Sequence, residues 1–123
     1  MGDRGNIVVD GVWMYTHWDG HGIKNVLKDA LQRGVGRWDD GPYLARIVFC
    51  QLIKGEKWDD TTGYGLSTSM QDNNNPILFV EPETRMVYEV EEKHVERHKD
   101  YDPEKAMNKW SFDDFVEQEF DED

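Results

Sequence analysis

The fold of this chain is decided by the stretch Ile7-Val8-Val9-Asp10-Gly11-Val12-Trp13-Met14-Tyr15-Thr16-His17-Trp18. In this stretch an Asp-Gly pair stands between two runs of strand-forming residues. An Asp-Gly pair in this setting favours a two-residue hairpin turn. The sequence therefore predicts two antiparallel strands, at residues 7–9 and 12–18. Since both sets of alternate residues in the second strand are substantially apolar, we expect both of its faces to be covered and the strand to be central.

Two helices are expected after this hairpin. Apolar residues recur at helical spacing over residues 21–33, and Gly34 is predicted to end that helix in the left-handed conformation. A second helix is predicted over residues 41–54, because Asp39-Asp40 supplies an acidic cap and Pro42 suits a first helical turn. The apolar surface of the second helix is wide, so we expect it to pack against both the sheet and the first helix.

Three further strands are predicted at residues 64–69, 77–80 and 85–90, the last two joined by a proline-containing turn. Runs of strands bracket the two helices instead of alternating with them, which is typical of an α+β fold. We predict an antiparallel sheet of about five strands with two helices packed on one face, plus an acidic C-terminal helix. The expected domains are an α+β core at residues 1–90 and an acidic extension at residues 91–123.

Charge is distributed unevenly along the sequence. The 123 residues include 14 basic and 26 acidic ones, a formal net charge of −12, and residues 106–123 hold seven acids with Lys109 as their one base. Such a surface repels a phosphate backbone, so direct nucleic-acid binding is not expected.

The single cysteine, Cys50, excludes an internal disulfide and is expected to be a buried packing thiol. With no apolar run long enough for a membrane, we expect a cytoplasmic protein.

The acidic C-terminal segment is the first candidate binding site. Its helix, capped by Ser111 with Asp114, carries aromatic residues at helical spacing among its carboxylates. Carboxylates would steer the segment into the basic groove of a partner protein and imitate phosphates, while the aromatic rings would anchor it. We therefore predict a small acidic protein-binding module without a cofactor, with a homo-oligomer as an alternative assembly. The predicted partner-binding residues are Trp110, Phe112, Asp113, Asp114, Phe115, Glu117, Glu119 and Phe120.

The second candidate site is the cluster of His17, Asp19 and His21, at the end of a strand and just before a helix. Imidazole and carboxylate groups there could ligate a metal ion, and Arg4 or Arg37 could clamp an anion. The alternative function is therefore a metal-assisted phosphoester hydrolase or a nucleotide-binding protein. The spacing more strongly favours a histidine packed in the sheet, a capping aspartate and a solvated histidine, so no catalytic residue and no tight metal site are predicted.

A basic-Trp-Asp-Asp pattern occurs twice, at residues 37–40 and 57–60. Its four carboxylates could gather around a hard cation, but caps and turns are the better interpretation of the aspartates. We expect Trp38 and Trp58 to be packing anchors. His94 and His98 lack the glutamate position of a metalloprotease helix and are predicted to be solvated.

Several of these motifs together resemble a family of short uncharacterised prokaryotic and phage proteins. The resemblance rests on residues 2–6 (Gly-Asp-Arg-Gly-Asn), 15–18 (Tyr-Thr-His-Trp), 37–40 (Arg-Trp-Asp-Asp) with 43–47 (Tyr-Leu-Ala-Arg-Ile), and 62–67 (Thr-Gly-Tyr-Gly-Leu-Ser), and it covers residues 1–90. It implies a folded unit of prokaryotic or viral origin and assigns no activity or catalytic residue. A phage-like distribution would fit an inhibitor of a host enzyme.

Overall fold

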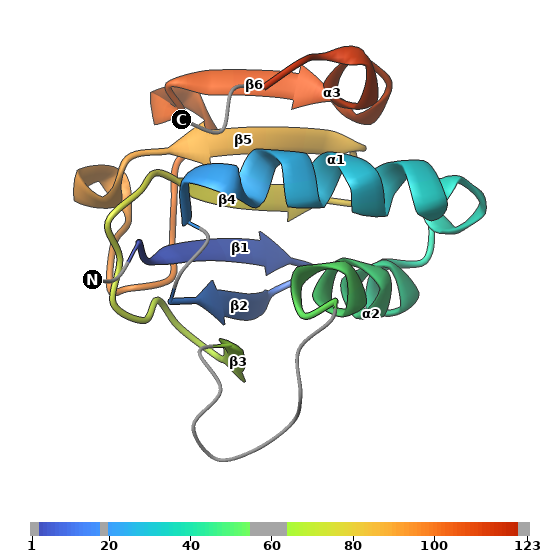
Figure 1. The fold of residues 1–123 in the computed structure, drawn as a ribbon. Coiled ribbons are helices and arrows are strands. Elements are labelled where there is room, and N and C mark those ends of the chain that lie inside the picture. The colour runs from blue at the N-terminus through green and yellow to red at the C-terminus, as the bar shows by residue number, and fades with distance from the viewer. Residues whose placement is uncertain (1–2, 18–19, 55–63, 121–123) are drawn as a thin grey trace.

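Six strands form one mixed sheet in the computed structural model, which describes residues 3–17, 20–54 and 64–120. The order across the sheet is β3-β2-β1-β4-β5-β6, and three α-helices complete an α+β fold (Figure 1). The strands are β1 (Gly5–Val9), β2 (Val12–Thr16), β3 (Tyr64–Ser67), β4 (Ile77–Glu81), β5 (Met86–Val90) and β6 (Asn108–Ser111).

The hairpin predicted at Asp10-Gly11 is confirmed. Asp10 and Gly11 both have positive φ, 52° and 82°, as a two-residue turn of this kind requires, and Val9 pairs with Val12 across it. Trp13 and Met14 are both buried although they face opposite sides of β2. Both faces of β2 are therefore covered, as the sequence indicated.

The expectation of a purely antiparallel sheet is wrong, because β1 and β4 run parallel. Residues 68–76 return along the sheet after β3, so that β4 enters in the same direction as β1. Buried Asn6 fixes this return: its amide nitrogen donates to the carbonyl of Asp72 at 3.3 Å, and its amide oxygen accepts from the backbone N–H of Gln71 at 3.2 Å. These long-range hydrogen bonds are not visible in a local sequence pattern.

The expected strand count is also too low by one, because β6 adds to the edge of the sheet beside β5. β6 is short, and its residues Asn108 and Lys109 are exposed. An exposed polar edge strand lacks the alternating apolar pattern by which strands are recognised. Its pairing nevertheless attaches part of residues 91–123 to the sheet of the predicted core.

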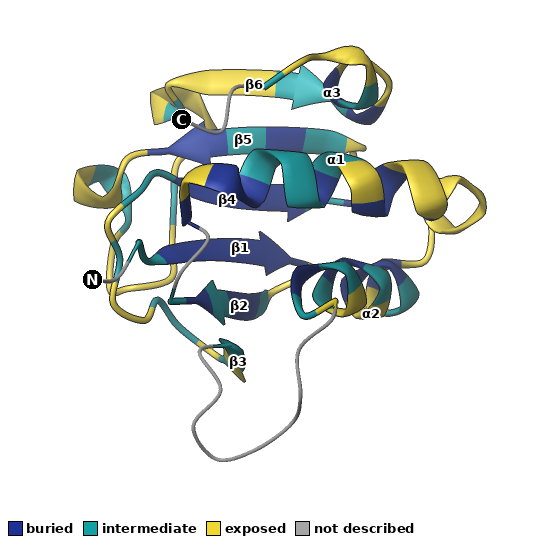
Figure 2. Cartoon of the chain, in the orientation of Figure 1, coloured by how far each residue is buried: buried dark blue, intermediate teal, exposed yellow. Residues whose placement is uncertain are grey.

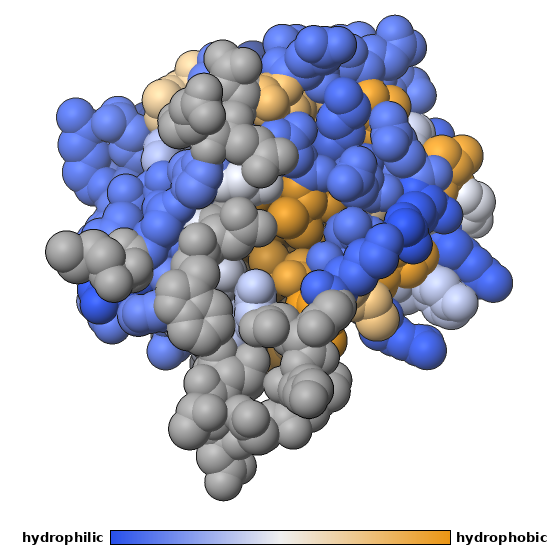
Figure 3. All heavy atoms as spheres, viewed as in Figure 1, coloured by the Kyte–Doolittle hydropathy of each residue, from blue (hydrophilic) through white to orange (hydrophobic). Residues whose placement is uncertain are grey.

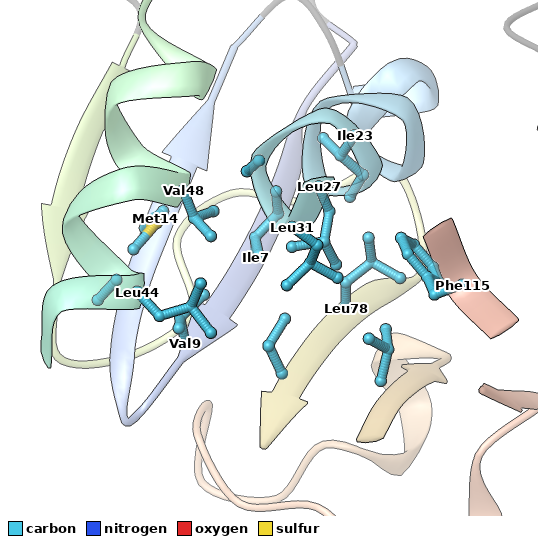
Figure 4. Packing of buried hydrophobic residues seen from close by; sticks show 14 of the residues in the cluster. Ile7, Val9, Met14, Ile23, Leu27, Leu31, Leu44, Val48, Leu78 and Phe115 are labelled. Carbon is cyan, nitrogen blue, oxygen red and sulfur yellow. The ribbon is translucent and has the colours of Figure 1, made fainter. Parts of the chain in front are cut away.

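Three helices cover one face of the sheet: α1 (Ile23–Arg33), α2 (Gly41–Leu52) and the short α3 (Phe112–Glu117). Figure 2 shows that each turns a buried side to the sheet and an exposed side to solvent. Apolar side chains from the helices meet Ile7, Met14 and Leu78 of the sheet in one core, and Phe115 completes it at one end (Figure 4). No helix among the described residues is long and apolar enough to cross a membrane.

One of the two predictions about helix ends is confirmed and the other is wrong. The Asp40 carboxylate accepts a hydrogen bond from the backbone N–H of Tyr43 at 3.3 Å, so the predicted acidic cap of α2 is confirmed. Gly34 does not adopt the predicted left-handed conformation, since its φ is −99°. A Cβ at Gly34 would lie 3.1 Å from the Ile47 side chain and 3.2 Å from the Ala30 carbonyl. Glycine at this position therefore lets the end of α1 approach α2 closely.

The opposite face of the sheet is covered by residues 91–106, which contain two short 3-10 helices. Tyr101 stacks on Phe79 with ring centroids 3.8 Å apart, and its hydroxyl donates a hydrogen bond to the Glu81 carboxylate. Burial and this hydrogen bond raise the pKa of Tyr101. The segment after β5 thus closes the second hydrophobic core.

Candidate functional site

The C-terminal aromatic residues lie against their own chain. Phe112 is 1% exposed and Phe115 is fully buried in the core under the helices. The expectation that these two rings anchor a partner is therefore wrong, because no partner can reach them in this fold. The predicted cap is confirmed, since Ser111 Oγ accepts a hydrogen bond from the backbone N–H of Asp114 at 3.1 Å.

The other aromatic residues of this segment, Trp110 and Phe120, are half-buried and pack against the same core. Two side chains of α1 hold the segment: Asn25 donates to the carbonyl of Phe120, and Gln32 donates to that of Val116, both at 3.1 Å. The carboxylates predicted to bind a partner, in contrast, are exposed: Asp113, Asp114, Glu117 and Glu119. A partner could reach these acids, but only without the buried aromatic anchors.

The cluster of His17, Asp19 and His21 is not assembled as a site by the described residues. The His17 ring hydrogen-bonds the Tyr15 hydroxyl at 2.9 Å, and His21 is exposed and paired with the Asp3 carboxylate. Asp19 lies outside the described residues. Within residues 3–17, 20–54 and 64–120, no three His, Cys, Asp or Glu side chains are grouped so that they could hold a metal ion.

Asp3 has a structural role beside His21. Its carboxylate accepts hydrogen bonds from the backbone N–H of His21 at 3.1 Å and from the Asn75 amide at 2.8 Å. Burial alone would raise the pKa of Asp3, but the hydrogen bonds from His21 and Asn75 and the charge of His21 outweigh it and lower the pKa below 3.8. Asp3 thus ties the start of β1 to the turn before α1 and to the loop before β4.

The first basic-Trp-Asp-Asp motif is structural, and the second lies outside the described residues. Trp38 is buried, donates its indole N–H to the carbonyl of Leu31 at 3.0 Å and meets Phe112 edge to face at 5.2 Å. The predicted packing anchor at Trp38 is therefore confirmed. Asp39 forms an ion pair with Arg85, and Asp40 caps α2, so both have structural roles.

A different site lies along α2, beside the segment that joins α1 to α2. A pocket of about 640 Å³ opens there, which we call the cationic pocket. Among the described residues, the charged side chains that line it are all basic: Arg33, Arg37, Arg46 and Lys54. Its neutral lining consists of Gly36, Tyr43, Ile47, Cys50 and Gln51.

Helical spacing explains how α2 supplies one wall of the pocket. Tyr43, Arg46 and Cys50 follow one another at intervals of three or four residues, which aligns them along one side of α2, and Lys54 follows just after the end of that helix. Opposite them stand the last residue of α1, Arg33, and the 3-10 turn Val35–Arg37. Figure 3 shows mostly hydrophilic residues over the helical face, with hydrophobic ones gathered near its centre.

Tyr43 holds two of the arginines in place. The guanidinium carbon of Arg37 lies over its ring at 4.3 Å from the centroid, and that of Arg46 lies over the same ring at 4.8 Å. Cation–π attraction orders both side chains but supplies no counter-charge. Because both distances end at the same centroid, the two guanidinium carbons are less than about 9.1 Å apart, the sum of the two distances.

No carboxylate of the described residues forms an ion pair with any of the four cations of the pocket. The acids nearest in sequence, Asp39 and Asp40, are engaged with Arg85 and with the start of α2. Cations elsewhere do find carboxylates: Lys24 with Glu89 at 3.1 Å, Lys93 with Glu91 at 3.9 Å, and Arg85 with Asp39. In a chain with 26 acidic residues, a basic cluster that has no ion pair within the described part of the chain is an unusual local feature.

The prediction that Cys50 is a buried packing thiol is wrong, because this residue is exposed and lines the cationic pocket. The apolar residues around it in the sequence indicated burial, but the buried stripe of α2 runs through Leu44, Val48 and Leu52 instead. A signal for the pocket was present in the sequence. Residues 33–54 contain four basic and two acidic residues within an otherwise acidic chain.

Of the two arginines predicted as anion clamps, Arg37 lines the pocket and Arg4 does not. Arg4 belongs to the segment tied to the loop before β4, where its backbone N–H donates to the Asn74 side chain at 3.1 Å.

Comparisons of this chain with family models, with curated proteins and with solved structures gave no match, so its resemblance to a family stays a prediction.

Proposed function

We propose that this protein binds a small phosphate-bearing ligand in the cationic pocket. The observation that carries the proposal is that, among the residues that the structure describes, four cationic side chains and no carboxylate line a pocket of about 640 Å³ in a chain of net charge −12. Pockets of this size are typical of small-molecule sites.

Electrostatics favours an anion between the arginines. Two unit charges about 9 Å apart repel by about 0.5 kcal/mol in water and by about 2 kcal/mol at an effective dielectric constant of 20. Cation–π contact with Tyr43 offsets this repulsion without removing it. An anion that contacts both guanidinium groups turns the repulsion into attraction.

Guanidinium geometry favours phosphate among anions. The planar fork of an arginine matches two oxygens of a phosphoryl group, and such charge-assisted hydrogen bonds are about twice as strong as neutral ones. Since Tyr43 already orders Arg37 and Arg46, less side-chain entropy is lost when a ligand binds. The proposal keeps Arg37 of the predicted nucleotide-binding alternative and moves the site away from His17 and His21.

Cys50 provides a direct test, because it is the chain's single cysteine and lines the pocket. We expect pyrophosphate to slow the alkylation of Cys50 by N-ethylmaleimide, a neutral reagent that the cations do not attract. Titration calorimetry measures the affinity in parallel. Arg37→Gln and Arg46→Gln are each expected to weaken pyrophosphate binding by about tenfold or more, the typical worth of a charge-assisted hydrogen bond.

Arg97→Gln is the matched control, since it removes the same charge at an exposed position outside the pocket. It should leave both measurements unchanged. The proposal fails if pyrophosphate neither protects Cys50 nor releases heat at about 10 mM, a concentration that detects a binding free energy of only about 3 kcal/mol. It also fails if Arg97→Gln weakens binding as much as the pocket variants do, because binding would then follow overall charge.

The predicted binding of a basic protein by the C-terminal carboxylates stays a prediction. Its aromatic anchors Phe112 and Phe115 are buried, so such binding would rest on Asp113, Asp114, Glu117 and Glu119 alone. Solvent-exposed ion pairs contribute little each and are weakened by salt. The cationic pocket is therefore the better-supported site.

A further inference from the structure

Resting on the proposed function, we infer that the ligand of the cationic pocket is a mononucleotide, whose phosphates meet the cations while its base lies against the flat and apolar part of the lining. The size, the mixed lining and the charge setting of the pocket each support this assignment.

The pocket is larger and less uniform than an anion alone requires. Its volume of about 640 Å³ lies within the range of small-molecule sites, and the pocket is open to solvent. Tyr43 and Ile47 supply an aromatic and an aliphatic side chain to the lining, beside the cations that meet the phosphates. The Gln51 amide offers both a donor and an acceptor to the edge of a base.

Charge outside the pocket favours a single nucleotide over a nucleic-acid strand. The pocket gathers four of the chain's 14 basic residues, while the protein as a whole carries −12. A mononucleotide confines its charge to the pocket. A strand continues beyond the pocket, where its further phosphates meet a protein that carries a net negative charge as a whole.

Gly36 leaves room on the pocket wall. Nothing lies within 4 Å of the position that a Cβ would occupy there, and the residue sits in a 3-10 turn that other residues can adopt. Gly36→Leu should therefore keep the fold while partly filling the pocket.

The test compares ATP, inorganic tripolyphosphate and a 12-residue oligothymidylate by titration calorimetry, with no divalent metal added. Tripolyphosphate carries more charge than ATP at neutral pH, so electrostatics alone makes it bind at least as tightly. If the protein also contacts the base, ATP binds more tightly than tripolyphosphate. We expect ATP to bind at least about fivefold more tightly than tripolyphosphate, as stacking of one base allows. We also expect it to bind more tightly than the oligonucleotide.

Variants and NMR locate the base. Tyr43→Leu should reduce the preference for ATP over tripolyphosphate, and Gly36→Leu should weaken ATP binding at least tenfold with an unchanged melting temperature. Saturation transfer from the protein should reach the adenine protons of ATP.

The outcomes separate the two proposals. The mononucleotide assignment is wrong if tripolyphosphate binds as tightly as ATP, or if no saturation is transferred to the adenine protons. Either result leaves the proposed phosphate site unaffected. Tighter binding of the oligonucleotide than of ATP overturns the mononucleotide assignment in favour of a nucleic-acid strand. Binding of none of the three ligands overturns the phosphate site itself.

Discussion

Phe115→Ala tests whether the C-terminal segment belongs to the core. Phe115 is fully buried, and its ring lies 5.1 Å from that of Trp110 and 4.8 Å from that of Phe120. Replacing a buried phenylalanine by alanine costs about 3–5 kcal/mol, from lost burial and from the cavity that remains. A domain of ordinary stability has about 5–15 kcal/mol in total, so the loss is large.

Urea unfolding followed by tryptophan fluorescence measures this loss. With a slope of about 2 kcal/mol per M, the unfolding midpoint of Phe115→Ala should fall by about 2 M. Glu117→Ala is the matched control, because Glu117 lies on the same helix and is exposed. It should change the free energy of unfolding by less than about 0.5 kcal/mol.

A midpoint for Phe115→Ala within the error of wild type would refute the reasoning. The ring would then contribute nothing to the fold, and the prediction that it anchors a partner would return. Equal losses for Phe115→Ala and Glu117→Ala would contradict the burial argument as well, since only one of the two side chains is enclosed.

Three further predictions concern the contacts that hold the elements in place. Asn25→Ala removes the hydrogen bond to the carbonyl of Phe120 and should cost about 1 kcal/mol, with faster amide exchange in α3 as the readout. Asp40→Ala removes the cap of α2 and should also cost about 1 kcal/mol, measured as a lower melting temperature. The folded-state pKa of Asp3 lies below its ordinary value, so its contribution to stability is present above that value and is lost as the pH falls through the lowered one. In Asp3→Asn, urea midpoints should therefore decline less steeply than in wild type as the pH falls below about 4.

Local signals predicted the elements that depend on a few neighbouring residues. Asp10-Gly11 fixed a turn because both positions need positive φ, and Asp40 with Pro42 fixed the start of a helix. The parallel pairing of β1 with β4 could not be predicted in this way. It depends on the polar contacts of Asn6 with residues more than 60 positions away.

The candidate site escaped prediction for a related reason. Its cations come from the end of α1, from a 3-10 turn and from α2, and only their meeting in space makes a pocket. The acidic C-terminal run was more conspicuous in the sequence, yet its phenylalanines were better explained as core residues. Composition indicated where charge lies along the chain but not which charges lack partners in the fold.

The side-chain Nε–H signals of the arginines in an NMR titration with ATP test the central claim most directly, because the chain carries its own controls. Three arginines line the cationic pocket, Arg33, Arg37 and Arg46, and three lie outside it, Arg4, Arg85 and Arg97. We expect ATP to shift the first three signals with one shared affinity and to leave the other three in place. Equal shifts in all six, or shifts confined to the arginines outside the pocket, would contradict a phosphate site at this position.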